Sequence, residues 1–251
     1  MAAEGHTIDA LGQFELGTVL GPIGASVRFS QSNLMMLIAA GLTLSLLYYG
    51  MRARAVVPGR LQAAAEMLYD FVHNMCTDQI GEEGKRFFPF VFTLFSFILF
   101  GNLLGLLPFS FTYTSHIAVT FSLALAVIVM VTVVALRIHG LHFFSYFFPA
   151  GAPIVLAPLI VTVEIISYLS RPVSLSIRLF ANMVAGHVMF EVFASFIVMM
   201  AGAGVIGYFG AVGPLALNVV LMGFELLVAC LQAYVFAVLT CIYLHDAVHL
   251  H

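Results

Sequence analysis

The C-terminal part of this chain contains an apolar segment, residues 154–200, that is far longer than one crossing of a bilayer requires. A crossing takes about 20 residues, because the hydrocarbon core is about 30 Å thick and a helix rises about 1.5 Å per residue. Every backbone polar group in hydrocarbon needs a partner within the protein, so such a segment folds as helix. The chain is 62% hydrophobic and 8% charged, whereas ordinary globular domains carry about 25% charged residues. We therefore expect an all-α integral membrane protein.

About five to six membrane helices are expected. Residues 31–53 predict a first span and residues 87–138 predict two more, each of ordinary length. Between them, residues 58–86 alternate apolar and charged positions at helical spacing, which predicts an amphipathic helix on the membrane surface. Residues 1–30 are mildly acidic and lack the features of a signal or transit peptide, so we expect a native, water-exposed segment.

Residues 151–249 form the third region, and they predict a long helical hairpin. A break rich in glycine separates its two helices, and it comprises Gly202, Gly204, Gly207, Gly210, Gly213 and Pro214. Each helix exceeds the thickness of the bilayer, so we expect the hairpin to be steeply tilted or to run partly along the membrane plane. Pro172 lacks a backbone donor and is expected to kink or under-wind the first helix.

Basic residues predict the orientation of the first three spans. They fall on one side of these spans, and they are Arg52, Arg54, Arg60, Lys85, Arg86 and Arg137. The turn on the other side, residues 108–116, contains only His116 as a possible charge. By the positive-inside rule the basic side is cytoplasmic or its equivalent, and the N-terminus is outside.

The hairpin is apolar but carries polar side chains in stripes. On a straight helix Glu164, Arg171 and Asn182 lie within about 40° of Arg178. His187 lies about 180° from Arg178, and Glu191 stands one turn beyond His187 on that far face. The second helix has its own stripe at seven-residue steps, formed by Asn218, Glu225 and Gln232.

Two interpretations of these side chains are open. Neutral amides such as Asn182, Asn218 and Gln232 commonly join membrane helices, so packing explains them as well as function does. Titratable groups within a membrane usually face a water path or a proton relay, and here they are Glu164, Glu191, Glu225 and His187. Arg178 is charged at any physiological pH and costs about 2.5–3.5 kcal/mol on insertion scales, which favours a functional role.

Several classes of function are disfavoured. Cys76, Cys230 and Cys241 show no spacing typical of a disulfide framework or zinc site. The basic residues form no cluster that could follow a nucleic acid backbone. No Gly-Lys phosphate loop is present, so no nucleotide is expected to bind directly. We expect no cofactor and no metal.

Two segments carry a specific resemblance, residues 171–187 (RPVSLSIRLFANMVAGH) and residues 231–244 (LQAYVFAVLTCIYL). Both resemble subunit a of the F-type ATP synthases, and residues 101–108 (GNLLGLLP) are similar to a further segment of that family. The order of spans matches over almost the whole chain. The resemblance implies a non-catalytic stator subunit with two proton half-channels beside a rotor ring of small subunits that carry carboxyl groups. It also implies contact with peripheral stalk subunits and the lipid bilayer.

The resemblance implies roles for individual residues. Arg178 corresponds to the essential arginine that faces the ring carboxylates, and Asn182 and Gln232 correspond to its polar neighbours. Glu164, His187 and Glu225 correspond to half-channel positions, whereas Arg171 and Glu191 are weaker correspondences. Many bacterial members have an acid at position 187 and a histidine at position 225. The exchange seen here resembles alphaproteobacterial and mitochondrial members, and it suggests that the two positions are close enough to compensate each other.

Two rival functions and two alternatives within the family remain. A proton-coupled secondary transporter would also place charges near the midplane, but it predicts an internal repeat that is not visible. A membrane metalloenzyme would use histidines as ligands, the candidates being His139, His142, His187, His245, His249 and His251. Protons are favoured over sodium ions, because the stripes lack additional oxygen ligands. We expect a bacterial inner (plasma) membrane location, with the mitochondrial inner membrane as the alternative.

Overall fold

The computed structural model describes residues 18–20, 29–52, 58–107, 112–140, 142–143, 156–202 and 204–249. Two short strands pair in antiparallel fashion ahead of the first helix, and helices form nearly all of the remaining described residues. In chain order the elements are β1 (Thr18–Leu20), β2 (Phe29–Ser30), α1 (Gln31–Arg52), α2 (Arg60–Ile80), α3 (Gly84–Gly105), the 3-10 turn η2 (Tyr113–Ser115), α4 (Ile117–His139), α5 (Ala157–Ala201) and α6 (Val205–Val248).

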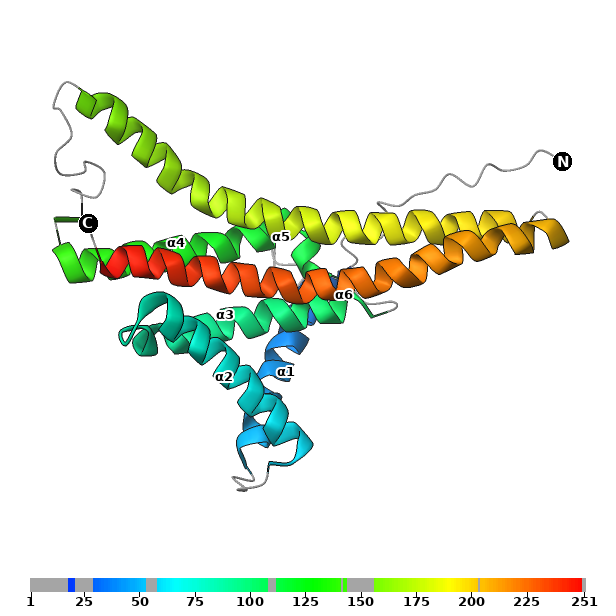
Figure 1. The fold of residues 1–251 in the computed structure, drawn as a ribbon, viewed down its shortest axis with the longest axis horizontal. Coiled ribbons are helices and arrows are strands. Elements are labelled where there is room, and N and C mark those ends of the chain that lie inside the picture. Colours follow the sequence, from blue (N-terminus) through cyan, green and yellow to red (C-terminus); the bar gives the residue numbers. More distant parts are fainter. Residues whose placement is uncertain are drawn as a thin grey trace.

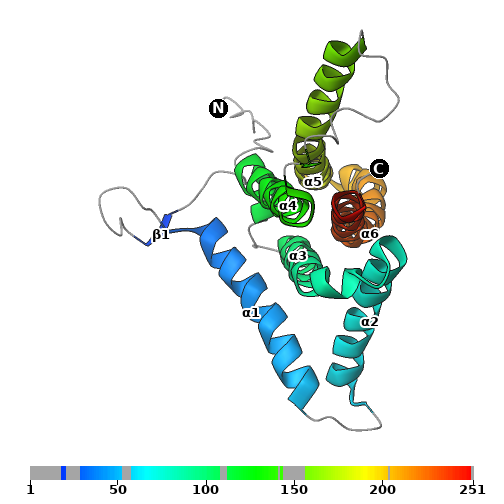
Figure 2. The ribbon, with the colours of Figure 1, turned by 90° about the vertical axis from the view of Figure 1, so that its left-hand side faces the viewer.

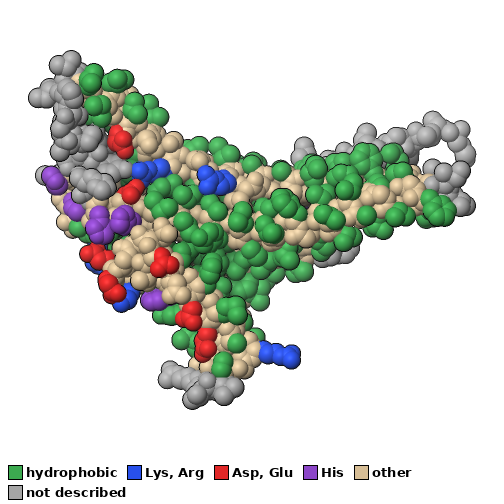
Figure 3. All heavy atoms as spheres, viewed as in Figure 1, with side chains coloured by type: hydrophobic (Ala, Val, Ile, Leu, Met, Phe, Trp, Pro, Cys, Tyr) green, Lys and Arg blue, Asp and Glu red, His purple; other side chains and the backbone are tan. Residues whose placement is uncertain are grey.

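Five of these helices are long and apolar enough to cross a membrane: α1, α3, α4, α5 and α6. Their outer faces carry large apolar side chains, such as Leu44, Val198 and Phe209, which are 68%, 72% and 79% exposed. Faces of this kind suit lipid rather than water. On the face drawn in Figure 3, charged and histidine side chains gather at one end and along the lower edge, and a few acidic and basic side chains interrupt the apolar surface over the first half of α5. The prediction of an all-α membrane protein is confirmed.

The hairpin of α5 and α6 is the longest part of the molecule (Figure 1). Its two helices have 45 and 44 residues, about twice the number that one crossing needs. The end view shows α3, α4, α5 and α6 clustered together, whereas α1 and α2 diverge from one another beside them (Figure 2). The surface helix predicted for residues 58–86 is shorter in the structure, since α2 ends at Ile80 and residues 84–86 already belong to α3.

The predicted glycine-rich break between the hairpin helices is wrong in its extent. The connection is confined to the few residues around Gly204, and α6 begins at Val205, so Gly207, Gly210, Gly213 and Pro214 lie inside the helix. Glycine and proline are common within membrane helices, because the surrounding helix keeps the backbone groups satisfied. Gly204 has φ 88°, a conformation that glycine adopts without strain, and this allows the chain to reverse.

Helix α5 bends along its length, so its first part leans away from α6 while its second part runs beside it (Figure 1). Pro172 lies inside this continuous helix and is the ordinary cause of such a bend. The fully buried residues of α5 all fall between Pro172 and Met183, at the spacing of one helix face: Pro172, Leu175, Ser176, Leu179 and Met183. The core therefore holds the middle of α5, which is the stretch that carries Arg178.

The core is formed where this stretch of α5 meets α3, α4 and the second half of α6. Ile98, Val127 and Phe236 are among its fully buried side chains. The described part of the connection between α3 and α4, residues 112–116, carries no acidic or basic residue except His116. Burial lowers the pKa of His116, so its imidazole is neutral near pH 7 and this side of the bundle gains no positive charge there.

Candidate functional site

Arg178 lies on the outer face of α5 while its neighbours Leu175 and Leu179 are buried in the core. Its side chain is exposed, and no carboxylate in the described part of the chain lies within ion-pair distance of the guanidinium. On the helical wheel positions 175 and 179 lie about 60° and 100° from Arg178, so the guanidinium stands at the edge of the buried face of α5. The chain thus presents a permanent positive charge at its surface within a membrane-spanning helix.

The opposite face of α5 carries a histidine that meets a glutamate of α6. His187 Nε2 lies 3.7 Å from Glu225 Oε1, and the same nitrogen is 2.9 Å from Thr112 Oγ1. Both partners of the histidine are buried. The proximity suggested by the exchanged residues at positions 187 and 225 is therefore present, and a proton bound by one group can pass to the other over a short distance.

Gly186 allows the two helices to come together at this pair. A Cβ added to Gly186 would lie 2.8 Å from Glu225 Oε1 and 3.2 Å from its carboxyl carbon. Any larger residue at this position would meet the carboxyl group. The absence of a side chain at position 186 is what gives Glu225 its place beside α5.

A groove of about 370 Å³ between α5 and α6 brings three predicted residues together. Its polar lining consists of Asn182 from α5 and of Glu225 and Gln232 from α6, and Met189, Leu221 and Phe224 are among the apolar residues around them. Mixed lining of this kind, mainly apolar with a few convergent polar groups, is typical of functional sites.

The remaining predicted residues lie apart from this groove. Asn218 is buried two turns before Glu225 on α6, and its Oδ1 has no hydrogen-bond partner in the described part of the chain. Glu191 is half-buried one turn beyond His187. Glu164 is half-buried in the first part of α5, on the other side of Pro172. The structure thus brings Asn182, His187, Glu225 and Gln232 close together and leaves Glu164 distant along the helix.

Arg171 differs from Arg178 in having an acidic partner. Its Nη1 lies 3.4 Å from Asp246 Oδ2, and its guanidinium also lies over the rings of Tyr168 and Tyr243, 5.6 and 5.0 Å from their centroids. Sequence reasoning placed Arg171 and Arg178 in one stripe, but the two arginines have different surroundings. Arg171 joins the end of α6 to α5.

The histidines considered as metal ligands make separate contacts in the structure. His139 Nε2 lies 3.2 Å from the backbone oxygens of Ala247 and Val248, and His245 packs against His249 with ring centroids 4.6 Å apart. Among the described residues, no group of three or more His, Cys, Asp or Glu side chains could hold a metal ion. His251 lies outside the described residues.

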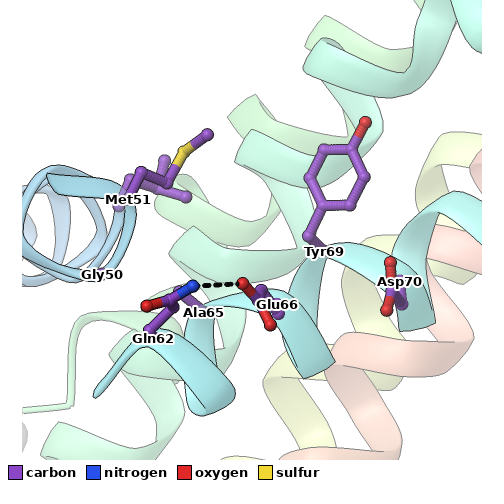
Figure 4. A pocket seen from close by; sticks show the side chains of 8 residues that line it. Gly50, Met51, Gln62, Ala65, Glu66, Tyr69 and Asp70 are labelled. Carbon is purple, nitrogen blue, oxygen red and sulfur yellow. Dashed lines mark hydrogen bonds between the residues drawn. The ribbon is translucent and has the colours of Figure 1, made fainter. Parts of the chain in front are cut away.

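A separate pocket of about 430 Å³ lies between α1 and α2 (Figure 4). Leu47, Gly50 and Met51 line it from α1, and α2 contributes Gln62, Ala65, Glu66, Tyr69 and Asp70. Gln62 Nε2 donates to Glu66 Oε1 over 2.8 Å across its floor. None of the residues predicted from the sequence takes part in it.

Thr112 is the residue at the histidine and glutamate pair that sequence reasoning does not predict. It precedes η2, 75 positions before His187 in the chain, so no periodicity links the two. The available signal is compositional: Thr112, Thr114 and Ser115 place three hydroxyl groups in a short connection between two apolar spans. Serine and threonine hydroxyl groups commonly bond to nearby backbone atoms, so this composition alone does not indicate a site.

Comparison with known proteins gives consistent matches. The model of the family described as ATP synthase A chain matches residues 33–245. The chain is 69% identical to ATP synthase subunit a of Granulibacter bethesdensis, with 100% of both chains covered. It is 66% identical to that of Gluconacetobacter diazotrophicus, over 98% of this chain and 99% of the relative. It is 50% identical to that of Rhodospirillum rubrum, over 91% and 92%.

Proposed function

Because the chain belongs to the ATP synthase A chain family, we propose that it offers two proton half-channels to a rotor ring, with Arg178 facing the ring carboxylates. In general terms it is a non-catalytic, proton-translocating subunit of a rotary ATP synthase.

The observation that carries the proposal is the exposed guanidinium of Arg178. This charge stands within a membrane-spanning helix, and the described part of the chain gives it no carboxylate partner. An arginine at such a depth costs about 2.5–3.5 kcal/mol on insertion scales. A carboxylate supplied by another subunit would offset that cost, and a ring of carboxyl-bearing subunits passing this face of α5 supplies one repeatedly.

The electrostatics then give a direction to proton exchange. A ring carboxyl group that faces lipid stays protonated, because ionising it in hydrocarbon is costly. Opposite Arg178 the ionised form is favoured, since a guanidinium forms strong charge-assisted hydrogen bonds with a carboxylate. Each arriving carboxyl group therefore releases its proton into one half-channel and takes up another from the second as it departs. The fixed positive charge also keeps a proton from passing directly between the half-channels.

Glu225 and His187 would serve as relay groups in one of these half-channels. Their separation of 3.7 Å supports this role, and so does the groove that joins Glu225 to Asn182 and Gln232. Imidazole and carboxyl groups in partly hydrated surroundings exchange protons near working pH. Asn218, Glu191 and Glu164 are assigned to the walls of the half-channels, and Asn182 and Gln232 to the polar neighbourhood of Arg178.

Membership of the family also bears on the membrane and the complex in which the chain works. The chain is a bacterial membrane protein that works in a complex with other subunits, and we assign it to the inner (plasma) membrane beside the rotor ring and the peripheral stalk. Moving one proton through a potential of 100 mV supplies about 2.3 kcal/mol. Several protons are therefore needed for each ATP, which fits a ring with several carboxyl groups.

Substitution of Arg178 in membranes that contain the whole complex tests the proposal. Arg178→Ala and Arg178→Lys are expected to abolish ATP-driven proton pumping and proton-driven ATP synthesis while the complex still assembles. Lysine keeps the charge but loses the planar, bidentate geometry, so it does not replace arginine. Arg137→Ala is the matched control, because Arg137 is also exposed but lies at the end of α4. Coupled pumping that survives in either Arg178 variant would refute the assignment.

A further inference from the structure

We propose that Thr112 is a positioning residue for proton transfer, whose hydroxyl group holds the imidazole of His187 beside Glu225. This inference rests on the proposed relay role of His187 and Glu225, and it adds a third member that lies outside the hairpin. Thr112 stands in the connection between α3 and α4, immediately before η2.

One ring nitrogen faces both neighbours. Nε2 of His187 lies 2.9 Å from Thr112 Oγ1 and 3.7 Å from Glu225 Oε1. The first distance is that of a hydrogen bond and the second is longer than one. The bond to Thr112 therefore fixes the direction in which Nε2 points, and Glu225 stands within reach of that nitrogen.

A hydroxyl group suits a partner whose protonation changes. When Nε2 carries no proton, the Thr112 hydroxyl donates to it, and when Nε2 is protonated, the hydroxyl oxygen accepts. Rotation about the C–O bond is enough to switch between these states. An amide or a carboxylate would favour one state of the ring, whereas threonine keeps the imidazole in place through both halves of a transfer.

The backbone and neighbouring side chains hold Thr112 in this position. Thr112 is buried, and Ser115 Oγ donates to its carbonyl oxygen over 2.5 Å. The hydroxyl group of Thr114 donates to Asn102 Oδ1 over 2.8 Å. Asn102 Nδ2 in turn donates to the carbonyl oxygen of Ala229 over 3.2 Å, one turn beyond Glu225. The connection is thus tied to α3 and to α6 next to the pair.

In the part of the chain that the structure describes, few titratable groups lie near this nitrogen. From α6 the imidazole faces Glu225, and on α5 Glu191 stands one turn further along the same face. The described part of the α3–α4 connection contributes hydroxyl groups and the neutral His116. This connection lies on the side opposite to the basic residues, so Thr112 approaches His187 from the face that the positive-inside rule places outside.

The test compares Thr112→Val with Thr112→Ser in membranes that contain the whole complex. Valine keeps the shape and removes the hydroxyl group, whereas serine keeps the hydroxyl group. We expect Thr112→Val to lower passive proton flux about tenfold and to shift the midpoint of its pH dependence, because the imidazole loses a hydrogen-bond partner that serves both of its protonation states. Thr112→Ser is expected to retain both properties.

Thr114→Val is the matched control. It removes the same group from the same connection, but its partner is Asn102 rather than His187. It is expected to reduce the amount of assembled complex and to leave the pH midpoint unchanged once flux is normalised to that amount. Thr112→Ala, which is smaller, replaces Thr112→Val in the comparison if the valine variant does not assemble.

The outcomes separate this inference from the function on which it rests. Wild-type flux and midpoint in Thr112→Val, or equal losses in the valine and serine variants, would overturn the role of Thr112. Glu225→Gln is measured in parallel. If Glu225→Gln leaves flux unchanged, the relay itself is wrong, whereas loss in Glu225→Gln together with wild-type behaviour in Thr112→Val refutes the inference about Thr112 alone.

Discussion

Replacement of Gly186 by alanine tests the geometry of the relay without replacing a polar side chain. The added Cβ would lie 2.8 Å from Glu225 Oε1, whereas ordinary contacts begin at 3.4 Å, so the oxygen has to retreat by about 0.6 Å. If the helices separate instead, overpacking costs about 1–3 kcal/mol. If the carboxyl group swings away, the off-rotamer cost is about 0.5–1.5 kcal/mol. Either response alters the 3.7 Å separation from His187.

These energies convert into a measurable effect. At about 1.36 kcal/mol for each factor of ten, 1–3 kcal/mol lowers the population of the paired arrangement between about 5-fold and about 150-fold. We expect passive proton flux in membrane vesicles to fall by about tenfold when it is normalised to the amount of assembled complex. Glu225→Asp, which shortens the side chain by one methylene group, is expected to restore part of the flux in the Gly186→Ala background.

Gly41→Ala is the control for the glycine substitution itself. A Cβ at Gly41 in α1 meets no described atom within 4 Å, so alanine there adds helix propensity without a new contact. Flux in Gly41→Ala should equal that of the unchanged protein. Equal flux in Gly186→Ala and Gly41→Ala would show that the close approach of Glu225 to α5 does not affect proton flux. That result would refute the proposed relay geometry.

Two further predictions follow from buried polar side chains. Glu225→Gln keeps the shape but cannot bind and release a proton, so flux should fall by more than about tenfold. Adding His187→Glu should restore part of it, and unchanged flux in Glu225→Gln would contradict the relay. Asn102→Ala removes the bonds that join Asn102 to Thr114 and Ala229 and should lower the stability of the protein in detergent by about 2 kcal/mol. Asn218→Ala is the comparison, because the oxygen lost there has no described partner, and an equal loss in both variants would contradict the proposed network.

The sequence was sufficient to predict the membrane helices, but not where α2 ends or where α6 begins. Arg178 can be chosen as a candidate functional residue from the sequence, because a cation that cannot be neutralised is unusual in an apolar segment. The proximity of His187 and Glu225 was predictable only from the exchange of residue types relative to related chains. Periodicity places each residue on a face of its own helix, but it does not say which faces of two helices meet.

Other features depended on tertiary contacts. The glycines between positions 207 and 213 suggest a loop in water, whereas in a membrane the helix continues through them, because an open backbone would lack partners. Arg171 and Arg178 share a stripe on the helical wheel, yet only Arg171 meets the acidic side chain of Asp246 at the end of α6. Thr112 could not be found from spacing, since its partner is remote in the chain and Thr112 itself lies outside the helices.

The most direct test of the central claim is to measure passive proton conductance and ATP-driven pumping in the same Arg178→Ala membranes. Arg178 is proposed to hold a ring carboxylate ionised and to keep the two half-channels apart. We expect coupled pumping to disappear in assembled complexes while protons still cross passively, because the barrier between the half-channels has been removed. Coupled pumping at the wild-type rate in Arg178→Ala would contradict the account.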